Sequence, residues 1–390
     1  QMNSDKQKNN SDLSRRQFLV HSAGVAGASM GLRATRAADS SCSEAEVRLG
    51  FIGLGDRGRQ LLGAALASAN ARVTALCDVD PSRLKRSLQI ARGEEGSGAG
   101  PRGFTNYRAL LDCRDVDAVV ISTPAYQHLP HTLTALAAGR HVYCEKPLGL
   151  TVEECRQLRR ACADAEGRGQ IYQCGLQRRY NPRYRESIRY VQGGEPGRIL
   201  FVRAQWHGVA SSRKNKPWLF RQEKSGGLAL EQGTHQFDVF NWVFSSTPVA
   251  AVALGGLNHS GASAPLQNTM DHYGAILEYP GGAKVQLSHM NFSIPDRRFS
   301  GAYELVFCEN AGVDISNATA WDASGKSREL CRVRGNETRL AMASFLESLL
   351  DGKRPDADIE VAYRATLSAL LCARALESDG RVTWDELESS

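Results

Sequence analysis

Three glycines spaced Gly-x-Gly-x-x-Gly follow an apolar stretch that begins at Val47, and a helical pattern rich in leucine and alanine comes directly after them. In this context Gly53 permits a tight turn, Gly55 lets the backbone approach a pyrophosphate, and Gly58 lets a helix pack on the preceding strand. The N-terminus of that helix offers free N–H groups to phosphate oxygens. The spacing therefore predicts a dinucleotide site at a strand-turn-helix junction, with a glycine turn in a generic α/β protein as the alternative.

A second predicted strand, from Arg72 to Cys77, ends in the acidic residue Asp78. A carboxylate at this strand end accepts hydrogen bonds from the ribose hydroxyls of adenosine and repels a 2′-phosphate. The cofactor predicted for this turn is therefore NAD, with NADP less favoured. The alternative interpretation of Asp78 is a surface acid at the start of the Asp80-Pro81 turn.

Strand and helix patterns continue to alternate after this acid. The expected strands are 117–121 and 141–144, and the expected helices are around 107–111, 128–138 and 152–166. Parallel strands need crossover helices, so this order predicts an α/β fold that begins with an N-terminal Rossmann domain containing a doubly wound parallel sheet. We place that domain at residues 47–168 and read Gly93 to Gly103 as an insertion or a long loop.

Polar residues follow two of these predicted strands. Thr123 and Pro124, with His128 soon after, follow one strand, and Glu145 and Lys146 follow the next. Ligands of doubly wound sheets bind beyond the carboxyl ends of the strands. These five residues are therefore candidates for the same site as the glycine turn.

The second half of the chain, residues 169–390, is rich in predicted strands. They cover 171–176, 199–207, 249–257, 272–279, 283–290 and 303–307, and helices are expected to about 192, at 337–350 and at 361–378. Hairpin signals such as Pro280-Gly281-Gly282 connect the later strands. The pattern predicts a C-terminal α+β domain with a large, mostly antiparallel sheet.

Glu231, His235 and Asp238 supply an acid, an imidazole and a second acid at the spacing of a helix. Spacings of four and three residues place all three on one face of a helix. A histidine beside Phe and Trp is often a core residue, so the spacing alone leaves a structural role open. Arg178 and Trp218, which lies in a polar and basic loop from 209 to 225, are further candidates for substrate contact, because aromatic rings stack on the C–H faces of sugars.

The chain resembles the Gfo/Idh/MocA family, which is named after glucose-fructose oxidoreductase and inositol dehydrogenase. The resemblance lies in the glycine motif, the Thr-Pro turn with its following histidine, the Glu-Lys-Pro sequence at 145–147 and the acid-x-Gly-x-His-x-x-Asp signature. The likeness covers nearly all of residues 47–390. It implies that Lys146, His235 and Glu231 are catalytic and that Arg57, Thr123, Pro124, His128 and Glu145 belong to the cofactor site. One departure is that Glu231 stands where the family usually has Asp, so the substrates of better-known members do not transfer. The family's exposed sheet face pairs subunits, so we expect a homodimer or homotetramer.

These residues support reversible hydride transfer between a secondary alcohol of a sugar or polyol and a tightly bound nicotinamide cofactor. His235 takes the hydroxyl proton as general base, and Lys146 stabilises the developing alkoxide. Glu231 or Asp238 orients the imidazole or holds a neighbouring hydroxyl. The alternative enzyme is a redox-neutral glycosidase or epimerase that acts by transient oxidation and elimination. A ligand sensor that keeps only the Rossmann half is a third interpretation.

The first 46 residues read as a twin-arginine signal peptide and linker. Arg15 and Arg16 sit within Ser-Arg-Arg-Gln-Phe-Leu, ahead of a small, weakly apolar stretch, which predicts export to the periplasm or another extracytoplasmic space. The first forty residues carry a net charge of +3 out of the formal +6 of the whole chain, and the absence of a basic stripe elsewhere argues against nucleic acid as a partner. No apolar run has the ~20 residues of a membrane-spanning helix, so we expect no membrane insertion.

Ten cysteines are scattered through the chain without a Cys-x-x-Cys pair. They could form five disulfides, but several fall inside predicted strands or helices, so we expect buried thiols. No spacing indicates a zinc site or another metal site.

Overall fold

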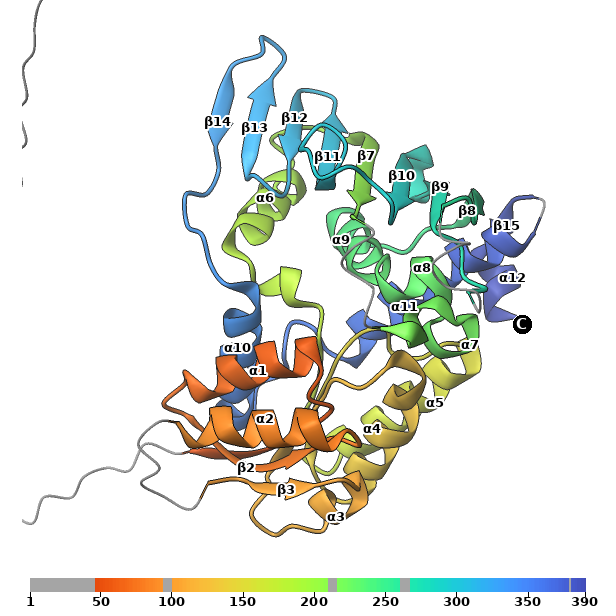
Figure 1. The fold of residues 1–390 in the computed structure, drawn as a ribbon. Coiled ribbons are helices and arrows are strands. Elements are labelled where there is room, and N and C mark those ends of the chain that lie inside the picture. Colours follow the sequence, from red (N-terminus) through yellow and green to blue (C-terminus); the bar gives the residue numbers. More distant parts are fainter. Residues whose placement is uncertain (1–45, 94–99, 210–215, 260–266, 379) are drawn as a thin grey trace, which may run out of the picture. The chain divides into compact units, whose positions relative to one another are not determined.

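Two sheets organise the residues that the computed structural model describes, namely 46–93, 100–209, 216–259, 267–378 and 380–390 (Figure 1). The first sheet has the strand order β3-β2-β1-β4-β5-β6, and every pair of neighbours is parallel. Its strands are β1 (Val47–Ile52), β2 (Ala71–Cys77), β3 (Arg102–Phe104), β4 (Ala118–Ile121), β5 (His141–Cys144) and β6 (Tyr172–Cys174). This is the order of the dinucleotide-binding doubly wound fold, and it confirms the predicted Rossmann sheet.

Helices pack against the first sheet in two separate groups, with α1 against α2 and α4 against both α3 and α5. These helices, and a 3₁₀ turn η1, are α1 (Asp56–Leu66), α2 (Pro81–Arg92), α3 (Tyr107–Leu111), η1 (Ala125–Gln127), α4 (His128–Ala137) and α5 (Val152–Glu166). Because helices cover the sheet, its central strands are apolar without alternation, and all four residues of β4 are fully buried.

The second sheet has the order β14-β13-β12-β11-β7-β10-β9-β8-β15, and only its β7–β10 pair is parallel. Its strands are β7 (Ile199–His207), β8 (Ala250–Gly256), β9 (His272–Glu278), β10 (Lys284–Met290), β11 (Gly301–Cys308), β12 (Ala311–Asp314), β13 (Thr319–Asp322), β14 (Ser327–Glu329) and β15 (Val382–Thr383). The predicted large, mostly antiparallel sheet is therefore confirmed. Strands β12 to β15 were not expected from the sequence.

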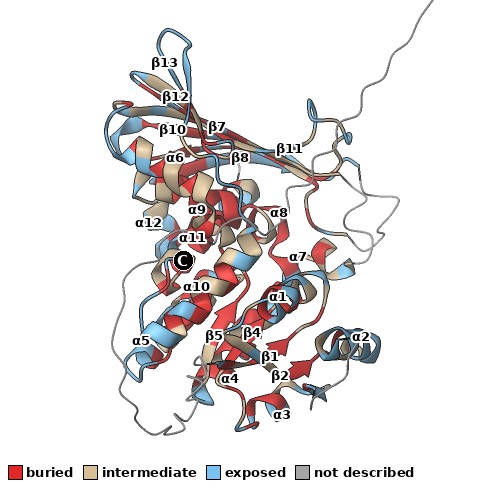
Figure 2. Ribbon diagram, turned by 90° about the vertical axis from the view of Figure 1, so that its left-hand side faces the viewer, coloured by how far each residue is buried: buried red, intermediate tan, exposed pale blue. Residues whose placement is uncertain are grey.

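One face of the second sheet is buried by helices, and the other is open (Figures 1 and 2). Helix α6 packs on β12, α11 packs on β8 and β9, and α9 lies against both helices. These and the remaining helical segments are η2 (Gln177–Tyr180), α6 (Pro182–Gln192), η4 (Pro217–Phe220), α7 (Gln222–Ser225), α8 (Gly227–Glu231), α9 (Thr234–Phe244), η5 (Pro280–Gly282), α10 (Glu337–Asp351), α11 (Ile359–Glu377) and α12 (Trp384–Glu388). Along β8 the burial alternates, with Ala251 and Ala253 buried and Val252 and Leu254 exposed.

The two halves share helices and a strand. Helix α10 packs on α1, and α11 packs on α5 and β6 as well as on the second sheet. Strand β6 belongs to the first sheet, although it lies a few residues beyond the domain boundary predicted at 168. Helices α10 and α11, which come after the Rossmann half in the sequence, therefore pack against it.

Three local predictions from the sequence differ from the structure or lie outside it. Asp80 and Pro81 begin helix α2: the Asp80 side chain caps the helix by accepting from the backbone N–H groups of Ser82 and Arg83. Within the loop expected at 93–103, residues 94–99 lie outside the described part and Arg102 begins β3. The export signal and the linker at 1–46 fall almost entirely outside the described residues.

All nine cysteines in the described part of the chain are free thiols, and eight of them are buried. This confirms the prediction of buried thiols for these positions, while Cys42 lies outside the described residues. Burial raises the pKa of Cys144 to about 12. Among the described residues, no helix combines the length and the apolar character that crossing a membrane requires.

Candidate active site

The glycine turn between β1 and α1 has the geometry that the sequence motif predicts. Gly53 has a φ of 91°, and a Cβ at this position would lie 2.9 Å from the backbone of Ser122. A Cβ on Gly58 would lie 2.1 Å from the carbonyl oxygen of Gly53, so only glycine lets α1 approach the turn. At Gly55, by contrast, a Cβ would meet nothing within 4 Å. The backbone there faces open space of the kind that a pyrophosphate needs.

Asp78 lies buried at the end of β2, beside the glycine turn. Its Oδ2 accepts a hydrogen bond from the Leu54 backbone N–H at 2.7 Å, and its Oδ1 accepts from the Asp80 backbone N–H at 2.8 Å. Each carboxylate oxygen has a second lone-pair direction for a ribose hydroxyl. The position and the acceptor-only chemistry of this residue fit the adenosine end of NAD.

His128 joins the two turns that follow β4 and β5. Its Nε2 lies 3.0 Å from the carbonyl oxygen of Thr123, and its Nδ1 lies 2.8 Å from the carbonyl oxygen of Pro147. Burial lowers the pKa of His128. Both ring nitrogens face the main chain, so this residue contributes to the predicted cofactor site by fixing the turns that carry Thr123, Pro124 and Lys146.

Glu145 and Arg57 form a largely buried ion pair at the same edge of the sheet. The Arg57 Nε donates to the Glu145 Oε1 at 2.6 Å, and its Nη1 donates to the Thr338 Oγ1 at 2.7 Å. Thr338 lies in α10, which the sequence places far downstream. Arg57 therefore ties the glycine turn to both the Glu-Lys-Pro turn and the C-terminal half.

Lys146 reaches from the Rossmann half to the C-terminal half. It precedes a cis peptide bond to Pro147, and its Nζ donates to the Glu231 carbonyl oxygen and lies 3.4 Å from the Glu231 Oε1. Both side chains are less than one-fifth exposed. The structure thus brings together two of the three predicted catalytic residues.

Glu231 and His235 do not share one continuous helix, contrary to the expectation from spacing. Helix α8 ends at Glu231, Gly233 lies at the break, and α9 begins at Thr234. The His235 backbone N–H donates to the Gln232 carbonyl oxygen across this break. His235 still follows Glu231 by a single turn of chain, and the positive charge of Lys146 acts on the imidazole by lowering its pKa.

The His235 imidazole is buried, and its Nδ1 has no hydrogen-bond partner among the described residues. Burial lowers the pKa of His235 well below its ordinary value, and the positive charges of Lys146 and Arg178 act in the same direction. The ring is therefore neutral near pH 7 and able to accept a proton.

Asp238 and Arg178, predicted as substrate contacts, each take part in a buried ion pair. The Asp238 carboxylate accepts from Arg179, with an Nη2–Oδ1 distance of 2.7 Å and an Nε–Oδ2 distance of 3.1 Å. Burial raises the pKa of Asp238, and the charge of Arg179 opposes that shift. The Arg178 Nη1 donates to the Glu304 Oε1 at 2.6 Å. In the structure, these two residues position α9 and β11 around the site.

Trp206 on β7 is an aromatic residue that the sequence reasoning missed. Its ring centroid lies 6.1 Å from that of His235, and the Arg178 guanidinium lies 5.2 Å from it. The predicted aromatic, Trp218, lies half-buried in η4, which packs against α7 and α8. The sequence shows only that Trp206 is an aromatic residue near the end of a predicted strand. It does not show which strand end lies beside His235, so it could not identify Trp206 as part of the site.

Residues 216–226, which we call the clasp segment, cross the carboxyl edge of the first sheet. The Lys216 Nζ lies 3.2 Å from the Asp56 Oδ2 beside the glycine turn, and the Lys224 Nζ lies 5.9 Å from the ring centroid of Tyr126. At the far end, a Cβ on Gly226 would lie 3.1 Å from Leu150. Of the loop predicted at 209–225, the described part is therefore largely helical and lies beside all three turns of the predicted cofactor site.

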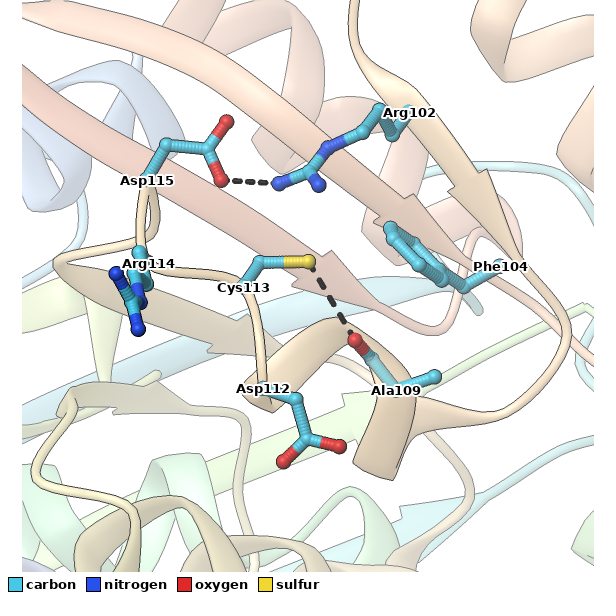
Figure 3. Close-up of a pocket in the computed structure, with 7 residues that line it drawn as sticks. All are labelled: Arg102, Phe104, Ala109, Asp112, Cys113, Arg114 and Asp115. Atoms are coloured by element: carbon cyan, nitrogen blue, oxygen red, sulfur yellow. Dashed lines mark hydrogen bonds and ion pairs between the residues drawn. The ribbon is translucent and has the colours of Figure 1, made fainter.

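A cavity of about 500 Å³ lies elsewhere, between β3 and α3 (Figure 3). Its lining includes Arg102, which forms an ion pair with Asp115, and Cys113, whose Sγ donates to the Ala109 carbonyl oxygen at 3.4 Å. None of the predicted site residues lines it. The candidate site is therefore the region between the glycine turn, Lys146 and His235.

Comparison with known proteins agrees with this architecture. Residues 47–173 match the oxidoreductase family with an NAD-binding Rossmann fold, and residues 184–311 match the GFO/IDH/MocA C-terminal domain. The chain is 30% identical to 1,5-anhydro-D-fructose reductase of Ensifer adhaerens over 84% of this chain and 96% of that protein.

Other relatives cover less of the chain. Inositol 2-dehydrogenase 2 of Saccharopolyspora erythraea is 31% identical over 53% of this chain and 56% of its own length. A glycosyl hydrolase family 109 protein of Shewanella amazonensis is 39% identical over 29% of this chain and 26% of its own. For the first three curated relatives, the match spans only 56 to 65% of their length.

The fold is shared with a solved structure of scyllo-inositol dehydrogenase from Lactobacillus casei with bound NAD(H) and scyllo-inositol. The TM-score is 0.72, the identity is 21%, and the match covers 87% of this chain and 99% of that one. Fold and site together define a protein with an NAD-binding Rossmann half and a mixed-sheet C-terminal half. The chain belongs to the Gfo/Idh/MocA family of oxidoreductases.

Proposed function

We propose that this protein transfers hydride between a secondary alcohol of a sugar or polyol and bound NAD. The observation that carries the proposal is the meeting of Lys146, from the carboxyl edge of the Rossmann sheet, with Glu231 just before the buried neutral His235. The relatives named as an inositol dehydrogenase and a sugar reductase support this class of substrate.

The residues divide the proton chemistry between them. His235 accepts the hydroxyl proton, and Lys146 donates a hydrogen bond to the same oxygen as negative charge develops on it. Glu231 holds the ammonium group in place through its carboxylate and its carbonyl oxygen. NAD, when bound, supplies the acceptor for the hydride that leaves the carbinol carbon. Loss of one proton and one hydride leaves a ketone.

The experiment that tests this function begins with the nucleotide. Denaturing the purified protein and identifying the released cofactor by mass spectrometry should yield NAD rather than NADP, because Asp78 disfavours a 2′-phosphate. The protein loaded with that cofactor is then screened against polyols and glycosides by absorbance at the wavelength of reduced nicotinamide. No reduction with any compound of a broad panel would contradict the proposal and favour a ligand sensor.

A redox-neutral glycosidase or epimerase remains the second candidate, supported by the short match to a glycosyl hydrolase family 109 protein. In that reaction, transient oxidation acidifies the neighbouring C–H, a leaving group is eliminated, water adds, and the ketone is reduced again. Solvent deuterium would appear beside the oxidised carbon with no net NADH. A plain dehydrogenase would instead accumulate NADH without that exchange.

We also propose that the cofactor stays bound through many turnovers, because the clasp segment contacts all three turns of its site. The Lys216–Asp56 pair is partly exposed, so its own contribution is modest. Lys216→Ala should raise the rate of nucleotide release about two- to fivefold, measured by gel filtration of the loaded protein and by the fluorescence of bound NADH. An unchanged release rate would show that this contact does not retain the cofactor.

Export by the twin-arginine route is our proposal for localisation. That route suits a protein that folds and loads its cofactor before export, and the free thiols of the described residues fit folding in a reducing compartment. Replacing Arg15 and Arg16 with Lys should keep the protein in the cytoplasm, as judged by cell fractionation. Continued export of that variant would contradict the route.

A further inference from the structure

The inner face of the second sheet reaches the site at Trp206, whose ring centroid lies 6.1 Å from that of His235. Trp206, His289 and Tyr273 stand side by side in register on the neighbouring strands β7, β10 and β9. His289 is fully buried and Tyr273 is 3% exposed, whereas Trp206 is half-buried. Trp206 is therefore the member of this row that keeps solvent-accessible surface next to His235.

The indole ring of Trp206 is held in a fixed plane. The His289 ring stacks on it at a centroid distance of 5.6 Å and an interplanar angle of 7°. His289 is itself fixed, because its Nδ1 lies 3.1 Å from the Tyr273 hydroxyl and its Nε2 lies 3.0 Å from the Gln232 Oε1. An aromatic ring held in this way loses little freedom when a ligand contacts it.

The other side of the indole has a small neighbour. Ala302 on β11 pairs in register with Trp206 and is exposed, so its methyl group covers little of the ring. The Arg178 guanidinium lies over the ring at 5.2 Å from its centroid, where its ion pair with Glu304 holds it, and so covers part of the indole. Strand β7 is also tied to α9, because the Gln236 Nε2 donates to the Gln205 carbonyl oxygen at 2.9 Å. This bond fixes the spacing between Trp206 and the helix that carries His235.

We propose that Trp206 is a specificity-determining residue that packs against the C–H face of a cyclic substrate while one substrate hydroxyl meets Lys146 and His235. This inference rests on the proposed function and narrows its substrate class. A pyranose or cyclohexane polyol gathers C–H groups on a ring face, and such a face matches the apolar, electron-rich face of indole. An acyclic polyol presents no rigid face of this kind and gains less from the contact.

The test uses the protein loaded with NAD and compares Trp206→Ala, Trp206→Phe and the wild type. Substrates are myo-inositol and methyl β-D-glucopyranoside as rings and sorbitol as an acyclic polyol. Trp206→Ala should raise KM for the rings about tenfold with kcat within about threefold, and should change KM for sorbitol much less. Trp206→Phe should stay within about threefold of the wild type. Trp321→Ala, on the distant strand β13, is the matched control and should change neither constant.

A second measurement does not depend on the folding of the alanine variant. Binding of myo-inositol should change the tryptophan fluorescence of the wild type, and Trp206→Phe should lose most of that change. Persistence of the full change in Trp206→Phe overturns the inference. A KM increase in Trp218→Ala with no increase in Trp206→Ala also overturns it.

Failure of the inference and failure of the proposed function give different results. If the wild type oxidises the rings and Trp206→Ala keeps their KM within twofold, the inference is wrong and the function stands. If the wild type binds the rings through Trp206 without oxidising them, the function is wrong and the contact stands. A wild-type protein that oxidises sorbitol but neither binds nor oxidises any ring overturns the inference alone, and one that oxidises no compound of the broad panel and binds no ring overturns both.

Discussion

Within the described residues, the basic side chains of the candidate site each have an acidic partner from another segment of the chain. The four ion pairs are Lys146–Glu231, Arg57–Glu145, Arg178–Glu304 and Arg179–Asp238. Positive charge beside the imidazole disfavours its protonated form, while the partner carboxylates keep the buried cations satisfied. The site therefore combines a neutral ring with a fixed ammonium group, which is the pairing that removal of a proton from an alcohol requires.

Loss of either group should remove most of the activity. We expect Lys146→Ala and His235→Ala each to lower kcat at least ~100-fold, because general base catalysis and alkoxide stabilisation each contribute that much. Steady-state kinetics on the best substrate of the screen measure the effect, and circular dichroism checks the fold. Lys353→Ala, an exposed lysine outside the site, should be normal. Near-normal turnover in a protein carrying both site substitutions would end the proposed mechanism.

Buried histidines also make stability depend on pH. Burial lowers the pKa of His131 from 6.5 to about 4. In the unfolded chain this histidine takes up a proton near pH 6.5, whereas in the folded protein it resists protonation until about pH 4. The stabilisation from the neutral form is therefore complete above pH 6.5 and is lost as pH falls towards 4, by up to ~3 kcal/mol.

Urea unfolding at several pH values between 7 and 4.5 measures this loss. His131→Gln should give a shallower fall of the free energy of unfolding with decreasing pH than the wild type, whatever its absolute stability. Parallel curves for the two proteins would show that His131 does not titrate in this way.

The sequence identified most of the candidate site residues, but it did not show which residues far apart in the chain contact each other. The glycines, Asp78, Lys146, Glu231 and His235 occur in motifs whose spacing has a physical reason. Glu304 sits in an apolar strand and meets Arg178 more than a hundred residues away, and no local pattern shows that contact. For the same reason, the sequence did not single out Trp206, which lies beside His235 in the structure.

At the level of helices and strands, the structure differs from the prediction where the same short sequence is compatible with two local structures. Asp80-Pro81 suits both a turn and a helix start, and here the capped start of α2 forms. Spacings of four and three at Glu231, His235 and Asp238 suit a single helix, yet the segment divides into α8 and α9 at Gln232 and Gly233. A Cβ on Gly233 would lie 2.4 Å from the Ala229 carbonyl oxygen, so this close approach requires glycine. Such breaks depend on tertiary packing rather than on helical periodicity.

Helix α1 offers a matched pair of glycines for testing the cofactor turn. Gly58→Ala places a Cβ 2.1 Å from the Gly53 carbonyl oxygen, so the turn must shift and nucleotide binding should weaken at least tenfold. Gly63→Ala meets nothing within 4 Å and should instead stabilise the helix by ~0.5–1 kcal/mol without affecting binding. Thermal unfolding and calorimetric titration with NAD measure both effects. Equal NAD affinity in the two variants would contradict the assigned role of the turn.

At the level of the whole molecule, the two halves depend on each other in ways that sequence order conceals. The structure confirms the predicted fold class, in which a parallel sheet is followed by a mostly antiparallel sheet. The bracing of the Rossmann half by α10 and α11 was not predicted, because amphipathic helices do not reveal which neighbour they cover. Since Arg57 bonds both Glu145 and Thr338, the cofactor turn and the C-terminal half share one set of contacts.

Several large apolar side chains are exposed on the open face of the second sheet. They include Val252, Leu254, Ile276 and Phe307, contributed by three strands. A patch of large apolar residues across a sheet is typical of an interface. We propose that a second copy of this chain covers it, giving the homodimer or homotetramer expected from the family resemblance.

Charge placed in the middle of that face should therefore separate the subunits. Leu254 is 77% exposed on β8, and Ile276 is 41% exposed on the adjacent β9, so Leu254→Glu combined with Ile276→Glu puts two carboxylates into the proposed interface at little cost to the fold of one chain. Light scattering after gel filtration should show the wild type as a dimer or tetramer and the double variant as a monomer. Val333→Glu, which is 60% exposed outside both sheets, should leave the assembly unchanged. A wild-type monomer, or a double variant that assembles normally, would mean that this face has another occupant.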